Sequence, residues 1–229
     1  MRYETITFVY NEEFLLPFYL NHYRFVDRFN FIYDVDSTDN TLDIIQSLTN
    51  ANIVFFKFPD MMDDEIKANE INRVYAGLSD CWVLNVDADE FAFIDSIPVS
   101  PVNCVSLHHV FRHRTDSDLD PGKPIKSQRA HGFLEPMYTK PILVRSGLSI
   151  KWQVGNHRII GMSNPPAAYD GAHWANADRC FYLKRRVRDR KQRQSKNNLA
   201  KKLTYQHHNI TEADVLKYCK EHENDPRCW

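Results

Sequence analysis

Two aspartates that follow an apolar run, Asp87 and Asp89, are the residues of this chain best placed to do chemistry. Residues 81–86 are mostly apolar and predict a buried strand, which ends in Asp87-Ala88-Asp89-Glu90. Because unpaired charge is costly in a protein core, carboxylates at the end of such a strand are expected to face a cavity or a cation. Asp87 and Asp89 alternate along an extended backbone and project to the same side, where two oxygen donors can hold Mg²⁺ or Mn²⁺ and its diphosphate. The alternative is a solvated acidic turn.

A second strand end repeats this arrangement. A short apolar run ends in Asp34, and the turn-favouring residues after it lead into apolar positions at helical spacing across 41–48. We expect Asp36 and Asp39 to order this turn and to cap the helix, because aspartate is favoured there by hydrogen bonding and by the helix dipole. A calcium loop of the EF-hand type is excluded, since its sixth position needs glycine but is Asp39, and its twelfth needs glutamate but is Ile45.

Periodicity and turn residues divide the first half of the chain into alternating strands and helices. Strands are expected at residues 3–10, 29–34, 52–58, 81–86 and 102–110, and helices at 13–25, 41–48 and 64–76. This alternation predicts an α/β fold with a parallel sheet, in which ligands bind beyond the carboxyl ends of the strands. No G-x-G-x-x-G segment occurs, so a dinucleotide-binding fold would have no phosphate loop. With 229 residues, 43% of them hydrophobic, the chain is expected to form one compact domain, 1–229.

The basic residues are concentrated near the C-terminus. The formal net charge of the chain is −1, yet residues 179–202 contain eleven lysines or arginines and a single acid. Such a run is often only a solvated helix face. Its cations can also steady a leaving diphosphate, for which Arg188, Arg190 and Arg193 are candidates, or bind a polyanionic acceptor such as a lipid phosphate, an anionic glycan or nucleic acid. A non-catalytic nucleic-acid-binding module would explain the basic run but would leave the acidic strand ends without a purpose.

Cysteine usage and hydropathy bear on the compartment. The five cysteines show no C-x-x-C spacing, and their odd number indicates free thiols in a reducing compartment rather than disulfides or a zinc site. No run of 18 apolar residues predicts a membrane span, and the first residues do not have the pattern of a signal peptide. A cytoplasmic location is therefore expected.

Four segments in order give the chain a resemblance to a known family. They are Val9-Tyr10-Asn11-Glu12-Glu13, residues 33–41, the Asp87-Ala88-Asp89-Glu90-Phe91 box and a later His-containing, Arg-rich tail. Together they resemble glycosyltransferases of the GT-A type, within the broad family 2 and closest to its subgroup resembling family 92. The resemblance implies a Rossmann-like domain with a mostly parallel central sheet and helices on both faces. Residues from 1 to about 95 would form the nucleotide-sugar half, and those from about 96 to 229 the acceptor half with its basic tail.

The same resemblance implies a metal-dependent transfer of a sugar, with inversion, from a nucleotide sugar to an acceptor hydroxyl. It places the turn containing Tyr10, Asn11 and Glu12 against the nucleoside, although Asn11 is as well explained by helix capping. Asp34 matches the position that meets the base, and a carboxylate accepts the N3–H of uracil, which favours a UDP sugar. The acceptor is a glycan, a lipid-linked sugar or another hydroxyl compound, or alternatively a modified base of a nucleic acid.

The metal and the catalytic base are the remaining assignments. The cofactor expected is Mn²⁺ or Mg²⁺, held first by Asp89, with Asp87 nearer the ribose or bridging through water. Family members often complete the metal shell with a late histidine, for which His173 is favoured over His157, and a neutral imidazole suits Mn²⁺. An inverting transferase also needs a carboxylate base in the acceptor half. Glu135 is the first candidate, with Asp170 as the alternative in the second half of the chain.

Overall fold

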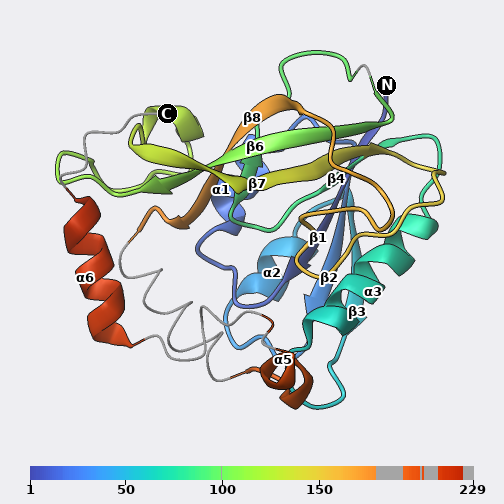
Figure 1. Cartoon of the computed structure of the whole chain (residues 1–229), viewed down its shortest axis with the longest axis horizontal. Coiled ribbons are helices and arrows are strands. Elements are labelled where there is room, and N and C mark those ends of the chain that lie inside the picture. Colours follow the sequence, from blue (N-terminus) through green and yellow to red (C-terminus); the bar gives the residue numbers. More distant parts are fainter. Residues whose placement is uncertain (99, 179–192, 202, 204–210, 224–229) are drawn as a thin grey trace.

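The described part of the protein is built around a sheet of eight strands in the order β3-β2-β1-β4-β7-β6-β8-β5 (Figure 1). The computed structural model describes residues 1–98, 100–178, 193–201, 203 and 211–223. The strands are β1 (Tyr3–Val9), β2 (Arg28–Asp34), β3 (Ala51–Phe56), β4 (Trp82–Asn85), β5 (Glu90–Ala92), β6 (Val102–Phe111), β7 (Gly132–Arg145) and β8 (Ala167–Asn176). The helices are α1 (Leu16–His22), α2 (Thr41–Gln46), α3 (Asp64–Ala76), α5 (Lys196–Ala200) and α6 (Glu212–His222), with a 3-10 turn, η1 (Ile125–Ser127).

The first half of the sheet is parallel, as the alternation of strands and helices predicts. β1 pairs in parallel with β2 on one side and with β4 on the other, and β2 pairs in parallel with β3. The carboxyl ends of β1, β2 and β4 therefore lie at one edge of the sheet, and the acids predicted to do chemistry follow these ends.

The second half of the sheet corrects the prediction of a mostly parallel sheet. β7 runs antiparallel to both β4 and β6, β5 runs antiparallel to β8, and only β6 and β8 form a parallel pair. The sheet is therefore mixed. The long strand β7 lies between β4 and β6. A segment from the second half of the chain therefore lies directly beside the last parallel strand, β4.

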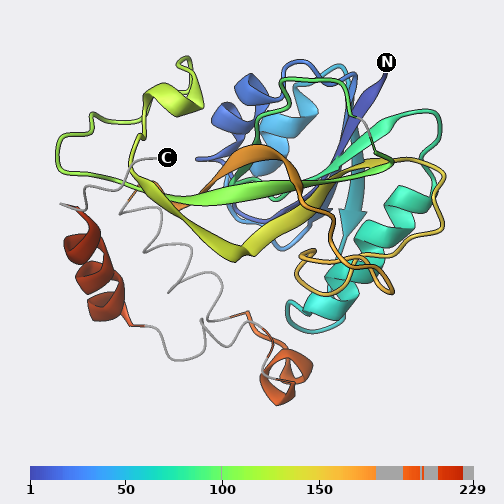
Figure 2. The same cartoon turned by 45° about the horizontal axis from the view of Figure 1, so that its top comes forward.

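Helices cover both faces of the parallel half, as expected. Side chains alternate along β1 and β2, so each strand contributes to two cores. Val9 and Phe31 pack in one core with residues of α1 and α2, whereas Phe8 and Ile32 pack in the other with residues of α3. Figure 2 shows the same division, with α1 and α2 on one side of the sheet and α3 on the other.

The boundaries agree closely with the sequence predictions except in α1. The helix predicted at 64–76 is observed over these residues, where Asp63 caps it by accepting hydrogen bonds from the amides of Glu65 and Ile66. Helix α1 begins only at Leu16, because residues 13–15 are held in turns that include hydrogen bonds to the carbonyl of Glu12. Within the described residues, no helix has both the length and the apolar character needed to cross a bilayer.

Candidate active site

The turns that follow β1 and β2 are locked together at the carboxyl edge of the sheet. The Asn11 side chain accepts a hydrogen bond from the Thr38 amide at 2.7 Å, and the Glu12 amide donates to the Thr41 hydroxyl at 2.7 Å. Asn11 has a φ of 53°, which asparagine tolerates better than most residues. Asn11 and Glu12 thus join the two turns, and the Asn11 side chain does not cap helix α1, whose N-cap residue is Leu15.

Of the two aspartates of the second turn, Asp39 has the ordering role that the sequence predicts. Asp39 accepts hydrogen bonds from the amides of Glu13 and Thr41, both at 3.0 Å. The N-cap residue of helix α2 is Asn40, but its side chain makes no capping hydrogen bond. Asp39 therefore orders the turn without being the N-cap residue. The Asp36 carboxylate lies 3.6 Å from the Arg193 guanidinium.

Three residues predicted to bind the nucleotide sugar meet beside this turn. Asp34 is completely buried, and its Oδ2 accepts hydrogen bonds from Nη1 and Nη2 of Arg193 at 3.0 and 2.9 Å. The guanidinium carbon of Arg193 lies 3.7 Å from the centre of the Tyr10 ring. Tyr10, Asp34 and Arg193 therefore form one cluster, which we call the Asp34 pocket.

The carboxylate of Asp87 lies between two ammonium groups. Lys67, from α3, approaches Asp87 Oδ1 at 3.0 Å, and Lys140, from β7, lies 3.9 Å from Asp87 Oδ2. Lys140 also forms a buried ion pair with Glu90, which in turn accepts a hydrogen bond from the Asp87 amide at 3.1 Å. Burial alone would raise the pKa of Asp87, but attraction to Lys67 and Lys140 outweighs it and holds that pKa below its usual range. Asp87 is thus ionised at neutral pH, with two ammonium groups beside it.

Asp89 lies against a pair of histidines. His173, from β8, places Nε2 3.3 Å from Asp89 Oδ2, and both side chains are largely buried. On the other side of the ring, Nδ1 of His173 lies 3.4 Å from Nε2 of His109, in β6. The strand register explains this meeting, because His173 pairs with Glu90 of β5 on one side and with His109 of β6 on the other. Of the two histidines predicted for the metal, the structure brings His173 to Asp89.

A tyrosine connects this centre to a large cavity. The Tyr138 ring packs against His109, His173 and His157, with ring centres 4.0, 5.4 and 5.6 Å away. His157 also lines a cavity of about 730 Å³ between β7 and the loop before β8, whose walls carry Thr139, Arg158, Met162, Ser163, Asn164, Pro165 and Pro166. His157 therefore stands between the cavity and the Asp89 centre rather than at Asp89 itself.

Asp89 and His173 offer two of the donor atoms that a divalent cation would need. Adjacent ligands of an octahedral Mg²⁺, each about 2.1 Å from the ion, lie about 3 Å apart, close to the Asp89–His173 separation of 3.3 Å. Among the described residues, no group of three His, Cys, Asp or Glu side chains is arranged to hold a metal. The described residues would thus supply two ligands, Asp89 and His173, and the remaining ligands would have to come from elsewhere.

Of the two candidates for the base, Asp170 is not brought together with Asp89. Asp170 lies three residues before His173 in β8, so the two side chains point to opposite faces of the strand. Its carboxylate is 70% exposed and lies 3.8 Å from His108. Glu135 belongs to β7, but its side chain is outside the described part of the structure, as are the whole of Arg188 and Arg190.

Sequence reasoning missed four residues of the site: Lys67, Lys140, His109 and Tyr138. The three on β6 and β7 reach the site through pairing between strands far apart in the chain, for which a single sequence contains no local signal. Lys67 has a weak signal, because a lysine near the start of a helix that follows a strand points towards the ligand edge of the sheet. Its contact with Asp87 spans 20 residues.

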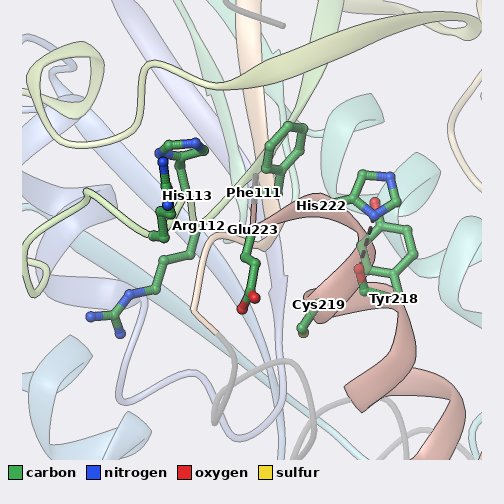
Figure 3. Close-up of a pocket in the computed structure, with 8 residues that line it drawn as sticks. Phe111, Arg112, His113, Tyr218, Cys219, His222 and Glu223 are labelled. Carbon is green, nitrogen blue, oxygen red and sulfur yellow. Dashed lines mark hydrogen bonds between the residues drawn. The ribbon is translucent and has the colours of Figure 1, made fainter. Parts of the chain in front are cut away.

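A second, smaller cavity lies apart from these residues (Figure 3). It has a volume of about 200 Å³, and it is lined from the end of β6 by Phe111, Arg112, His113 and Arg114 and from α6 by Tyr218, Cys219, His222 and Glu223. None of the residues predicted from the sequence to act on a ligand lines it.

Comparison with known proteins gives the following findings. No family profile and no curated protein matches the chain. Structural likeness is found to TarS of S. aureus, residues 1–349, with a TM-score of 0.42 and 15% identity over 97% of this chain and 70% of that one. The complex of the same protein with UDP-GlcNAc gives a TM-score of 0.43 and 17% identity, covering 97% and 71% of the two chains. HddC from Yersinia pseudotuberculosis gives 0.32 and 12%, covering 64% and 75%. Likeness at this level establishes neither a family nor an activity for this chain.

Proposed function

We propose that the protein is a metal-dependent glycosyltransferase that moves a sugar from a nucleotide sugar, UDP-linked, to an acceptor hydroxyl. The observation that carries the proposal is the meeting of Asp89 with His173 at the strand edge that also bears the Asp34 pocket. At one end of this edge, Asp34 supplies a carboxylate and Tyr10 an aromatic face for a nucleobase. The other end offers two donors spaced for a divalent cation and the partly exposed Lys67, which suits a nucleoside diphosphate.

In this proposal the chain's own residues bind the two ends of the donor. Tyr10 offers its ring to the uracil, and the Asp34 carboxylate accepts the uracil N3–H. Lys67, which is partly exposed, supplies positive charge beside Asp87, and such a cation stabilises a leaving diphosphate, whereas Lys140 balances the buried Glu90. Mn²⁺ or Mg²⁺ held by Asp89 and His173 would neutralise further charge on that leaving group.

The transfer is one direct displacement with inversion. An acceptor oxygen attacks the anomeric carbon from the face opposite the diphosphate, the bond from that carbon to the phosphate oxygen breaks, and a carboxylate takes the hydroxyl proton. Glu135 is the proposed base, and Asp170 is the alternative. The cavity beside His157, about 730 Å³ in volume, is large enough to receive an acceptor of one or a few sugars.

Melting temperature with Mn²⁺ and a panel of nucleotide sugars tests the proposal. We expect a rise with one UDP sugar that is absent with inorganic phosphate and with duplex DNA. Asp89→Asn should lose the Mn²⁺-dependent part of the rise and the slow hydrolysis of the donor, while Asp95→Asn, at an exposed carboxylate, should keep both. A rise with duplex DNA alone would instead support a nucleic-acid-binding module, and full hydrolysis in excess EDTA would exclude the metal site.

The base and the stereochemistry have their own test. Glu135→Gln should abolish transfer and leave donor binding unchanged, whereas Asp170→Asn should change neither. If transfer survives in the first variant and is lost in the second, the base is Asp170. The coupling constant of the anomeric proton in the product, measured by NMR, should show a β linkage when the donor is α-linked.

A further inference from the structure

Arg193 already makes the contacts that the proposed function gives to the nucleobase. Its guanidinium stacks 3.7 Å above the centre of the Tyr10 ring and donates two hydrogen bonds to one oxygen of Asp34, at 3.0 and 2.9 Å. The other oxygen of Asp34 accepts from the Asp36 amide at 3.1 Å. The Arg193 side chain is only 13% exposed, so it is largely buried in its contacts with Tyr10 and Asp34.

A guanidinium and a uracil can make the same kinds of contact with Tyr10 and Asp34. Both are flat, both stack on an aromatic face, and both donate in their plane to a carboxylate, the guanidinium through several N–H groups and the uracil through N3–H. An oxygen of a carboxylate has two lone pairs, and the two N–H groups of Arg193 use both on Asp34 Oδ2. A base that binds to Tyr10 and Asp34 therefore has to replace Arg193.

The backbone that follows Arg193 is hydrogen-bonded to residues at the start of α3, which favours a replacement by movement of the side chain alone. Ser195 donates its amide to the Met62 carbonyl at 3.0 Å and its hydroxyl to Asp63 at 2.9 Å. Asn198, completely buried, donates to the Asp64 carboxylate at 2.9 Å. The segment from Arg193 to Asn198 is thereby attached to the start of α3, and a rotation about the side-chain bonds of Arg193 is enough to open the pocket.

We propose that Arg193 is a built-in occupant of the nucleobase site that the incoming nucleotide displaces. This inference rests on the proposed function. As a consequence, the apparent affinity for any ligand of the Asp34 pocket equals the intrinsic affinity multiplied by the fraction of molecules in which Arg193 has left the pocket. A nucleoside alone competes poorly, whereas a nucleotide gains enough from its diphosphate at the Asp89 centre to displace the arginine. The site thus favours the complete donor over nucleoside fragments.

Calorimetry with three probes tests this role of Arg193. In Mn²⁺, Arg193→Ala should bind uridine and UDP more tightly than the native protein, by the same factor of about tenfold or more, because both compete for the opened pocket. The affinity for pyrophosphate, which does not enter the pocket, should not change. Lys201→Ala is the matched control, since Lys201 lies in the same segment and its ion pair with Glu65 is on the surface. All three affinities should be native in that variant.

The opposite sign would overturn the proposal. If Arg193 holds the diphosphate, Arg193→Ala weakens UDP and pyrophosphate and leaves uridine unchanged. Unchanged affinities for all three probes would also overturn it, and in both cases the native binding of UDP still supports the proposed function. Absence of UDP binding in the native protein and in every variant would reject both the role of Arg193 and the proposed function. Arg193→Lys guards against misfolding, because it keeps a cation beside the buried Asp34; it should tighten uridine and UDP by a smaller factor.

Discussion

Replacing Lys140 by methionine should destabilise the protein by about 3–5 kcal/mol, the usual result of removing one partner from a buried ion pair. Lys140 and Glu90 are both almost completely buried, with side chains 5% and 2% exposed. Methionine keeps the length and most of the packing of the lysine stem, so the measured loss reports the charge. The variant leaves Glu90 without its cation and removes one of the two cations beside Asp87.

Urea unfolding measures this loss, with Lys67→Met as the matched control. Lys67 contacts the same Asp87 carboxylate, but this pair is 21% and 22% exposed, so the control should cost only about 1 kcal/mol. In the double variant Lys140→Met/Glu90→Gln the combined loss should fall short of the sum of the two single losses by at least about 1.5 kcal/mol, because the two residues act as a unit. A loss below about 1 kcal/mol in Lys140→Met would refute the reasoning.

The pH dependence of the same variant gives a second measurement. Since the folded pKa of Asp87 is depressed, its stabilising effect is present above its unfolded pKa of about 3.9 and is lost as the pH falls through the lower folded value. Lys140→Met removes one cause of the depression, so acid unfolding should begin at a higher pH than in the native protein. An identical acid transition in the two proteins would contradict this assignment.

Three further predictions concern other parts of the molecule. Gly171→Ala should destabilise the fold by about 1–3 kcal/mol in urea unfolding, because its added methyl group would lie 2.7 Å from the Phe91 carbonyl oxygen. Gly122→Ala should cost less, because its methyl group would lie 3.2 Å from the flexible Asp120 side chain. Asn198→Ala should make the chain near residue 198 more sensitive to limited proteolysis without changing the melting temperature of the sheet by more than a few degrees, because it removes the buried hydrogen bond to α3. Cys104 should be alkylated far more slowly than Cys219 at pH 8, as peptide mass mapping can measure, because burial raises the pKa of the Cys104 thiol to about 11.

The sequence was sufficient for the parallel half of the fold because its signals are local. Each apolar run there ends in a carboxylate or a turn, and each helix pattern follows within a few residues, so β1, β2, β4 and the ligand edge could all be predicted. The same logic selected Asp34, Asp87 and Asp89, which the structure places at that edge.

The antiparallel half could not be predicted in this way. Strand β7 contains Pro136 and Pro141, which weaken the strand pattern, and β5 has only three residues, too few to show a period. Which strand β7 joins depends on packing between segments more than 45 residues apart, as in the pairing of Leu84 with Leu143. Lys140 reaches the site through that pairing, so the residues next to it in the sequence give no sign of its role.

The place of β7 between β4 and β6 also affects how the chain can be assembled during synthesis. Until residue 140 has left the ribosome, Glu90 has no ammonium group to neutralise it, and β4 has one edge without a partner strand. An emerging chain that stops before β7 therefore carries an open sheet edge beside uncompensated negative charge, which favours association with chaperones or with other chains. The parallel half is thus not an autonomous folding unit, and truncations that end between residues 95 and 132 should yield insoluble protein even though they retain every acid of the predicted donor site.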